Sequence, residues 1–496
     1  MPSLVFLCAR QLLRHQASAC RALAQLPEEL YPVLFKAAFM DGKPLVLQEL
    51  VRRWPFALLS FRELLRECRH CGRTLLRERP GRDSLQAVIL GLAARLRQPP
   101  PARRRQQLQV LDMTGLPDGD GSGSSERDPK TMSMWARTVA VAKTCIAVGR
   151  RQAGAARRPS KRPTVDRPAL EVRADLLVNR TSYGVLREAL ASGGPVRLLC
   201  RDLRAEELSL TSTVGLLELL DPLYLRQVDL RFNNLGLSGL CVVIPHMAKF
   251  ANLLSLKLQY SNVDVRRLSA EMEGSFRYFV AQLGKLGRLR ELNMGSSRLS
   301  GRLRQLLSGL RSPLESLELA FCYLLPADFS YLSQSPHASA LKKLDLSGNN
   351  LSPPLLGPFR TLLREASPSL LHLEATECQL TDAHLATVLP ALGRCARLRY
   401  LGLFGNPLST QGLKALLRRT EGLGELRLVV YPFPVDCYRG PPRPPPAAGP
   451  PDGELDRERL SLVQAELLQM LRAARRAHVL WTTDAYGHGA LDYFSL

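Results

Sequence analysis

The chain has 496 residues, 45% of them hydrophobic, so it is long enough to bury a large core. Its formal charge of +23 raises the question of nucleic-acid binding, but residues 1–180 carry 32 Lys and Arg against 16 Asp and Glu, whereas the other 316 residues carry 36 against 29. This distribution argues against a basic groove along most of the chain. Eleven scattered cysteines without framework spacing indicate a reducing compartment, and we expect the cytoplasm, with the nucleus as the alternative. The sequence contains no run of 18 apolar residues, so it predicts no membrane-spanning helix.

Residues 1–100 are predicted to form a helical region, because apolar residues recur at helical spacing from residue 30 to residue 96. Its first motif is Ser3-Leu4-x-x-x-Cys8-x-x-x-Leu12. On a helix Leu4, Cys8 and Leu12 form one stripe, which could lie in the apolar groove of a partner. The motif resembles the Elongin BC box of cullin-type ubiquitin-ligase receptors.

The second motif in this region is Leu26-Pro27-x-x-Leu30-x-x-x-Leu34, with the proline placed for the first turn of a helix. It resembles a cullin-2 box, and also the start of an F-box, which would imply a different adaptor. The alternative for both motifs is a helix that packs on its own domain, since leucines four residues apart commonly belong to a core.

Residues 101–430 are predicted to form a leucine-rich-repeat solenoid. Three weak strands, at 108–113, 170–176 and 196–203, are interpreted as degenerate first repeats. A basic insertion at about 117–168 interrupts them, and we expect much of it to be disordered, with a short helix around 132–148. Arg157 to Arg162 could be a nuclear-import signal or a solvated linker.

The pattern L-x-x-L-x-L-x-x-(N/C/S)-x-L then recurs every 25 to 36 residues. Its copies start at Leu225, Leu253, Leu289, Leu314, Leu341, Leu370 and Leu398, and a truncated copy starts at Leu423. Each repeat is long enough for a strand and a helix, which predicts an α/β horseshoe of the ribonuclease-inhibitor type with a parallel concave sheet and outer helices. Residues 431–496 are predicted to be a Pro-rich spacer and a C-terminal cap that contains an amphipathic helix over 455–477.

Period-two alternation identifies the side chains that should face outward from the concave sheet. The candidate client-binding residues are Asp229, Arg231, Lys257, Glu291, Glu318, Lys343, Asp345, His372, Glu374, Tyr400 and Phe404. Acidic, basic and aromatic side chains are mixed, whereas a phosphate-binding groove should be uniformly basic. We therefore expect a protein client, and neither nucleic acid nor a membrane as partner.

No catalytic motif is present, and Cys68-Arg-His-Cys71 lacks the second ligand pair that a zinc site needs. The sequence therefore predicts no enzyme, no cofactor, no metal and no small-molecule substrate.

Several segments together resemble the PRAME family. They are Leu-Pro-x-x-Leu-x-Pro-x-Leu-Phe at 26–35, Leu-Gln-Val-Leu-Asp-Met at 108–113, Val-Arg-Ala-Asp-Leu at 172–176, Leu-Lys-Lys-Leu-Asp-Leu-Ser-Gly-Asn at 341–349 and Pro-Phe-Pro-Val-Asp-Cys-Tyr at 432–438. The resemblance implies a cytoplasmic binding protein linked to a cullin-2–Elongin B/C ubiquitin ligase. It also implies damping of Toll-like-receptor and NF-κB signalling, by binding the β subunit of the IκB kinase through the repeats and hindering assembly of the kinase complex. A nuclear factor that uses the basic insertion is a further alternative.

Overall fold

The computed structural model describes residues 3–65, 81–97, 108–118, 131–155, 170–192, 196–351, 353–439 and 453–485. These residues fall into two compact units that divide between Gln227 and Val228. None of the described helices is both long enough and apolar enough to span a bilayer.

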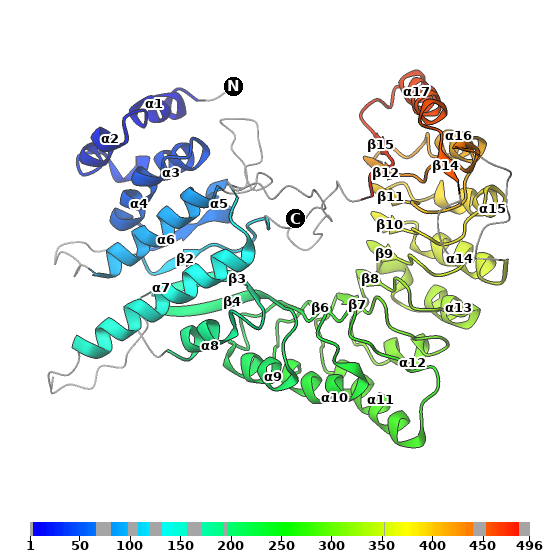
Figure 1. The fold of residues 1–496 in the computed structure, drawn as a ribbon, viewed down its shortest axis with the longest axis horizontal. Coiled ribbons are helices and arrows are strands. Elements are labelled where there is room, and N and C mark those ends of the chain that lie inside the picture. Colours follow the sequence, from blue (N-terminus) through cyan, green and yellow to red (C-terminus); the bar gives the residue numbers. More distant parts are fainter. Residues whose placement is uncertain are drawn as a thin grey trace. The chain divides into compact units, whose positions relative to one another are not determined.

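The first unit begins with the predicted helical region (Figure 1). Its elements are α1 (Leu4–Leu12), α2 (Gln16–Ala22), η1 (Glu28–Leu30), α3 (Tyr31–Met40), α4 (Pro44–Arg53), β1 (Leu58–Ser60), α5 (Phe61–Leu65) and α6 (Arg82–Arg97). The core contains Phe35, whose ring meets Trp54 edge-on at 5.8 Å and Phe61 at 5.5 Å between ring centroids. Helices α4 and α6 approach so closely that a Cβ on Gly91 would lie 2.5 Å from the Gln48 carbonyl oxygen. The short strand β1 was not predicted.

The remainder of the first unit alternates strands and helices. It contains β2 (Val110–Asp112), α7 (Met134–Ala155), β3 (Leu170–Val178), α8 (Tyr183–Ala191), β4 (Val196–Ala205) and α9 (Leu210–Leu219). Strands β1 to β4 pair in chain order, and all are parallel. The three predicted weak strands are thus confirmed as repeat strands, and β1 precedes them.

Helix α7 corrects the interpretation of residues 117–168 as an insertion that interrupts the repeats. The helix is longer than expected, it buries Val141, Ala142 and Cys145, and it lies between β2 and β3 in the order of a repeat. The Leu177 amide on β3 donates a hydrogen bond of 2.9 Å to the Thr138 hydroxyl. The predicted disorder falls on 119–130 and 156–169, which lie outside the described residues.

The second unit is the array of clear repeats. Its elements are β5 (Gln227–Asp229, which spans the boundary), α10 (Gly236–Met247), β6 (Ser255–Lys257), α11 (Ala270–Leu283), β7 (Glu291–Asn293), α12 (Leu303–Leu307), β8 (Ser316–Glu318), α13 (Pro326–Gln334), η3 (Ala338–Ala340), β9 (Lys343–Asp345), α14 (Pro353–Ala366), β10 (His372–Glu374), α15 (Asp382–Leu392), β11 (Tyr400–Gly402), α16 (Thr410–Arg419), β12 (Leu428–Val430), η4 (Val435–Cys437), β13 (Tyr438–Arg439), β14 (Glu454–Leu455), α17 (Arg457–Ala473) and β15 (Leu480–Thr482).

Strands β6 to β12 pair in parallel and in chain order, and the helices follow one another along one side of them (Figure 1). The middle residue of each strand is buried. It is leucine in β6 to β11, as in Leu317 and Leu344 at 0% exposure, and Val429 in β12. The predicted leucine-rich-repeat solenoid is confirmed.

A buried polar side chain closes the turn after most strands. Asn349 donates to the carbonyl oxygens of Leu319 at 2.9 Å and Leu346 at 2.8 Å, and so joins one repeat to the preceding one. Asn406 makes the equivalent pair of bonds further along the array. These bonds explain the asparagine at the ninth position of the repeat pattern.

The last repeat is covered by β15, which pairs with β12, and by α17, which packs on α16. Arg476 follows α17 and donates hydrogen bonds to the carbonyl oxygens of Thr420 at 2.7 Å and Leu423 at 3.2 Å. These contacts are those of a cap. The Pro-rich spacer at 440–452 and residues 486–496 lie outside the described residues.

Candidate protein-binding surfaces

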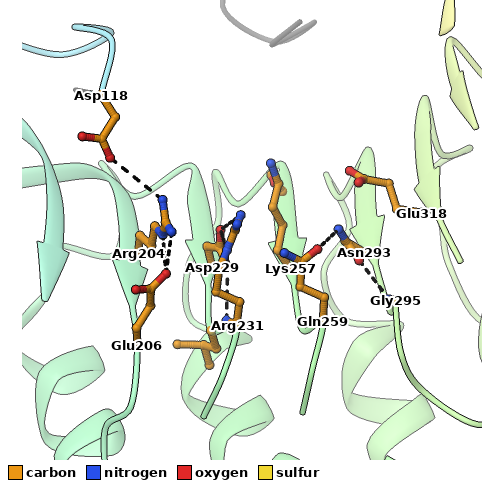
Figure 2. Close-up of polar contacts among 12 residues, drawn as sticks. Asp118, Arg204, Glu206, Asp229, Arg231, Lys257, Gln259, Asn293, Gly295 and Glu318 are labelled. Carbon is orange, nitrogen blue, oxygen red and sulfur yellow. Dashed lines mark hydrogen bonds and ion pairs between the residues drawn. The ribbon is translucent and has the colours of Figure 1, made fainter. Parts of the chain in front are cut away.

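The sheet of the second unit carries a row of polar side chains on the face away from the helices, which we call the polar strip. It consists of Asp229, Arg231, Lys257, Glu291, Glu318, Lys343, Asp345, His372, Glu374 and Tyr400. Figure 2 shows part of the strip, with Lys257 beside Gln259 and the Asp229–Arg231 pair on the neighbouring strand. The strip contains the residues predicted for the concave face except Phe404, which follows β11, and client binding on it stays a prediction.

At the N-terminal end of the strip, each cation forms an ion pair with a carboxylate of the strip. Arg231 holds the Asp229 carboxylate at 2.5 Å. The Glu291 carboxylate accepts from Lys257 at 3.4 Å and from the hydroxyls of Ser255 and Ser316. Asp229 and Glu291 are only 2% and 4% exposed. Neighbouring side chains enclose these carboxylates, whereas alternation alone predicts a row of solvated charges.

In the centre of the strip, Lys343 and Glu318 form an ion pair of 2.9 Å, with side chains 12% and 13% exposed. Burial opposes ionisation of Glu318, but Lys343 and Lys257 outweigh it and lower the pKa of this carboxyl. At Asp345, hydrogen bonds from Ser347 offset the effect of burial only in part. Burial, assisted by Glu374 and Glu318, raises its pKa to about 6.

Towards the C-terminal end the strip becomes aromatic. The rings of His372 and Tyr400 stack at 4.0 Å between centroids. Burial lowers the pKa of His372, so this ring is neutral at physiological pH. Phe404 lies beyond the strand and meets Phe433 edge-on at 6.1 Å. Aromatic side chains at the end of a charged row suit recognition of a folded protein.

The described residues contain no group of three or more His, Cys, Asp or Glu side chains that could hold a metal ion. The Cys68–Cys71 segment lies outside them. The three cations of the strip are already paired with carboxylates, which fixes their positions before any client arrives and favours binding through complementarity.

A second surface of this unit was not predicted from the sequence. It lies in the turns that follow the strands, and we call it the aromatic ridge: Phe232, Tyr260, Phe321 and Tyr323, with exposures of 48%, 48%, 40% and 57%. These residues occupy the eighth and tenth positions of the repeat pattern. Comparing those positions between copies would have shown them, whereas a search of strand positions could not.

On the first unit, helix α1 exposes the stripe that the first motif predicts. Leu4 is 76% and Leu12 38% exposed, and Cys8 is exposed as well. The opposite face of the helix is core, because Phe6 and Leu13 are buried. Ser3 caps the helix by accepting a hydrogen bond of 3.3 Å from the Phe6 amide, which gives the first residue of the motif a structural role.

The second motif does not form a single exposed stripe. Pro27 is exposed and precedes η1, whereas Leu34 on α3 is buried at 2% exposure. Leu26 and Leu30 are half-buried. Leu34 belongs to the core of the first unit, and any adaptor contact here is confined to residues 26–30.

Comparison with known proteins gives the family. A model of the PRAME N-terminal domain matches residues 1–120, and a model of the PRAME C-terminal domain matches residues 190–494. The chain belongs to the PRAME family. It is 59% identical to leucine-rich repeat-containing protein 14 of Homo sapiens, with all of both chains covered. It is 30% identical to PRAME family member 20 of Homo sapiens, over 97% of this chain and 94% of that protein.

Among solved structures, the leucine-rich repeat-containing protein LegL7 from Legionella pneumophila aligns with 66% of this chain and 92% of its own, at 15% identity and a TM-score of 0.35. In this PRAME-family protein, the N-terminal family domain contains α1 and its exposed stripe. The C-terminal family domain contains both the polar strip and the aromatic ridge.

Proposed function

We propose that this PRAME-family protein captures a protein client on the polar strip, and that the client is the β subunit of the IκB kinase. Occupation of that subunit would hinder assembly of the kinase complex and damp NF-κB signalling downstream of Toll-like receptors in the cytoplasm. The identity of the client comes from the family resemblance. The observation that supports protein capture is the row of paired charges along consecutive strands.

This row favours a protein over other ligands for a physical reason. Five carboxylates and three cations are interspersed on the strip, so both signs of charge occur along it. A polyanion would meet carboxylates along the row, whereas a folded protein can present a complementary pattern of mixed charges. Because the pairs are already formed, binding requires little further ordering of side chains.

A double charge swap tests this proposal. Lys343→Glu with Glu318→Lys keeps an ion pair at the 2.9 Å contact but exchanges its charges, so the fold should persist while complementarity is lost. The matched control is Arg302→Glu with Glu273→Arg, which swaps the 3.1 Å pair beside helix α12. Titration with purified β subunit should show at least roughly tenfold weaker binding for the first variant and parental binding for the second. Equal affinities for all three proteins would reject the strip as the client site.

The second candidate function is that of a substrate receptor of a cullin-2–Elongin B/C ubiquitin ligase. The observation that favours it is helix α1, whose exposed apolar stripe of Leu4, Cys8 and Leu12 lies opposite a buried face. An exposed stripe on a helix of nine residues is the form that helix-in-groove recognition requires. A helix serving only as core would bury these side chains.

The receptor function predicts a specific loss. Leu4→Glu with Cys8→Arg should abolish co-purification of Elongin B/C while the melting curve and client binding are retained, since both side chains are exposed. Leu7→Glu, an exposed position about 100° around the helix from Cys8 and on the side away from Leu12, is the control. Leu26→Asp with Pro27→Ala should weaken cullin-2 recruitment alone. Undiminished Elongin binding by the folded double variant would leave blockade of the client as the sole function.

The third interpretation is a nuclear factor that uses the basic insertion. Its basic run falls on 156–169, outside the described residues, so no structural observation favours it. Salt-sensitive retention on DNA that vanishes when residues 156–168 are deleted would support it, and retention unaffected by the deletion would remove it.

A further inference from the structure

The aromatic ridge occupies backbone positions that suit glycine. The residue at the eighth repeat position has a positive φ in every full repeat, and in two repeats it is a glycine, Gly348 at 67° and Gly405 at 70°. In three other repeats this residue is aromatic: Phe232, Tyr260 and Phe321 have φ values of 59°, 58° and 56°. Bulky side chains rarely adopt this conformation because Cβ crowds the backbone, and residues held there cluster at functional sites.

Burial does not offset this strain. Each of these aromatic residues leaves 40% or more of its surface in water, whereas the leucines at the first and sixth positions of the same repeats are at most 1% exposed. The rings are nevertheless well ordered by their neighbours. Phe232 and Tyr260 stack at 4.7 Å between centroids, and Phe321 lies so close over Gly348 that a Cβ there would come within 2.0 Å of the ring. Strained, exposed and fixed rings are the marks of a binding surface.

The row of rings indicates the shape of the ligand. Tyr260 and Phe321 belong to repeats two apart, with the small Ser296 at the position between them. A polyproline II helix presents a residue on the same face at every third position, and such helices dock on aromatic-lined surfaces. An extended segment with prolines three residues apart therefore suits a row of separated, exposed rings.

The charge beside the ridge indicates which residues of the ligand should flank its contacts with the rings. Arg266 lies over the Tyr323 ring at 5.8 Å, and the Asp264 carboxylate accepts from Arg266 at 2.8 Å and from Arg298 at 3.4 Å. One carboxylate faces two guanidinium groups whose side chains are 41% and 50% exposed, so this cluster has a surplus positive charge. It complements an acidic side chain.

We propose that the aromatic ridge binds an extended, proline-containing segment of a partner protein, with prolines on Tyr260 and Phe321 and a carboxylate beside Arg266 and Arg298. The ridge is a different surface from the polar strip, and this inference goes beyond the proposed client. It does not depend on the client's identity.

Three labelled synthetic peptides of twelve residues test the proposal on the full chain by fluorescence anisotropy. The first has proline at every third position and two flanking glutamates, the second has lysines in place of the glutamates, and the third keeps the glutamates but replaces each proline with alanine. We expect the first to bind and the other two to bind at least about tenfold more weakly. No binding of the first peptide, or equal binding of the first and third, would overturn the proposal.

The double variant Tyr260→Gly with Phe321→Gly separates recognition from folding. We expect it to lose the first peptide while its melting temperature equals or exceeds that of the parent, because glycine relieves the left-handed backbone. Glu377→Gly makes the same change at an equivalent position, φ 55°, without removing a ring, and should leave peptide binding unchanged. A double variant that still binds the peptide, or that melts well below the parent, would show that the rings serve only the fold. Binding of the β subunit by that variant reports separately on the polar strip.

Discussion

Replacement of Asn349 by alanine tests how consecutive repeats are joined. The side chain is 1% exposed, and its amide group donates to the carbonyl oxygens of Leu319, Leu346 and Ser347 at 2.9, 2.8 and 3.3 Å. Its carbonyl oxygen accepts from the Leu324 amide at 3.1 Å. Asn349 thereby connects its own turn with the preceding repeat through groups that water cannot reach.

The expected cost follows from these contacts. A net hydrogen bond contributes about 1 kcal/mol, and each buried group left without a partner costs about 1–3 kcal/mol. Some carbonyls keep another donor, since Leu346 still accepts from the Cys378 thiol at 3.3 Å. We therefore expect Asn349→Ala to lower the free energy of unfolding by about 3 kcal/mol, measured by urea denaturation followed by far-UV circular dichroism.

Ser297 occupies the same repeat position and provides the control. It is fully buried, and its hydroxyl is one of the few buried polar groups of the described residues without a hydrogen-bond partner. Ser297→Ala should leave stability unchanged or raise it by about 1 kcal/mol. Similar losses for the two alanine variants would refute the reasoning, because the position would then matter through packing and not through its hydrogen bonds.

Three further predictions concern the strip, the leucine core and helix α7. Asp345→Asn should stabilise the protein by on the order of 1–3 kcal/mol at pH 7.5 and not at pH 3.5. The raised pKa of about 6 favours the protonated carboxyl in the folded state, so the stability that Asp345 contributes is complete below its ordinary pKa near 3.8 and is lost as the pH rises through 6. Equal effects of the substitution at both pH values in thermal melts would contradict this. Leu401→Ala, at a fully buried position, should cost roughly 2–5 kcal/mol in the same denaturation assay, and an unchanged midpoint would remove Leu401 from the core. Replacement of residues 134–155 by a short linker should unfold the first unit, because α7 covers β3, whereas removal of 156–168 should be tolerated; a folded, soluble protein without α7, judged by circular dichroism, would restore the insertion hypothesis.

Most of the fold can be predicted from the repeat pattern. Every full copy from Leu225 to Leu398 contains a strand at its central apolar residue, because a leucine placed every second residue can be buried only by stacking on the next repeat. The truncated copy was placed wrongly: β12 pairs Val429 with Leu401, so this copy starts three residues after Leu423. Helix α7 was underestimated for the opposite reason. Small residues such as Ala142 and Thr138 pack well against a sheet, but composition alone does not distinguish them from a solvated segment.

The candidate surfaces were harder to foresee than the fold. Alternation predicted which side chains share the polar strip, but burial of Glu291 depends on Ser255 and Ser316 on neighbouring strands, 36 and 25 residues away. Leu34 fits the spacing of a docking stripe and yet is core, since helical spacing does not say which face of a helix is covered. Phe232 and Tyr260 stack only because consecutive turns have the same left-handed geometry.

Hydroxyl-radical footprinting of the full chain, with and without saturating β subunit of the IκB kinase, reports on client capture at the polar strip itself. Tyr400 and Phe404 lie at the aromatic end of the strip, and Tyr278 on α11 is 46% exposed and serves as an internal reference. We predict that oxidation of Tyr400 and Phe404 slows in the complex while that of Tyr278 does not change. Protection of Tyr278 alone, or of none of the three in a saturated complex, would contradict client capture on the strip.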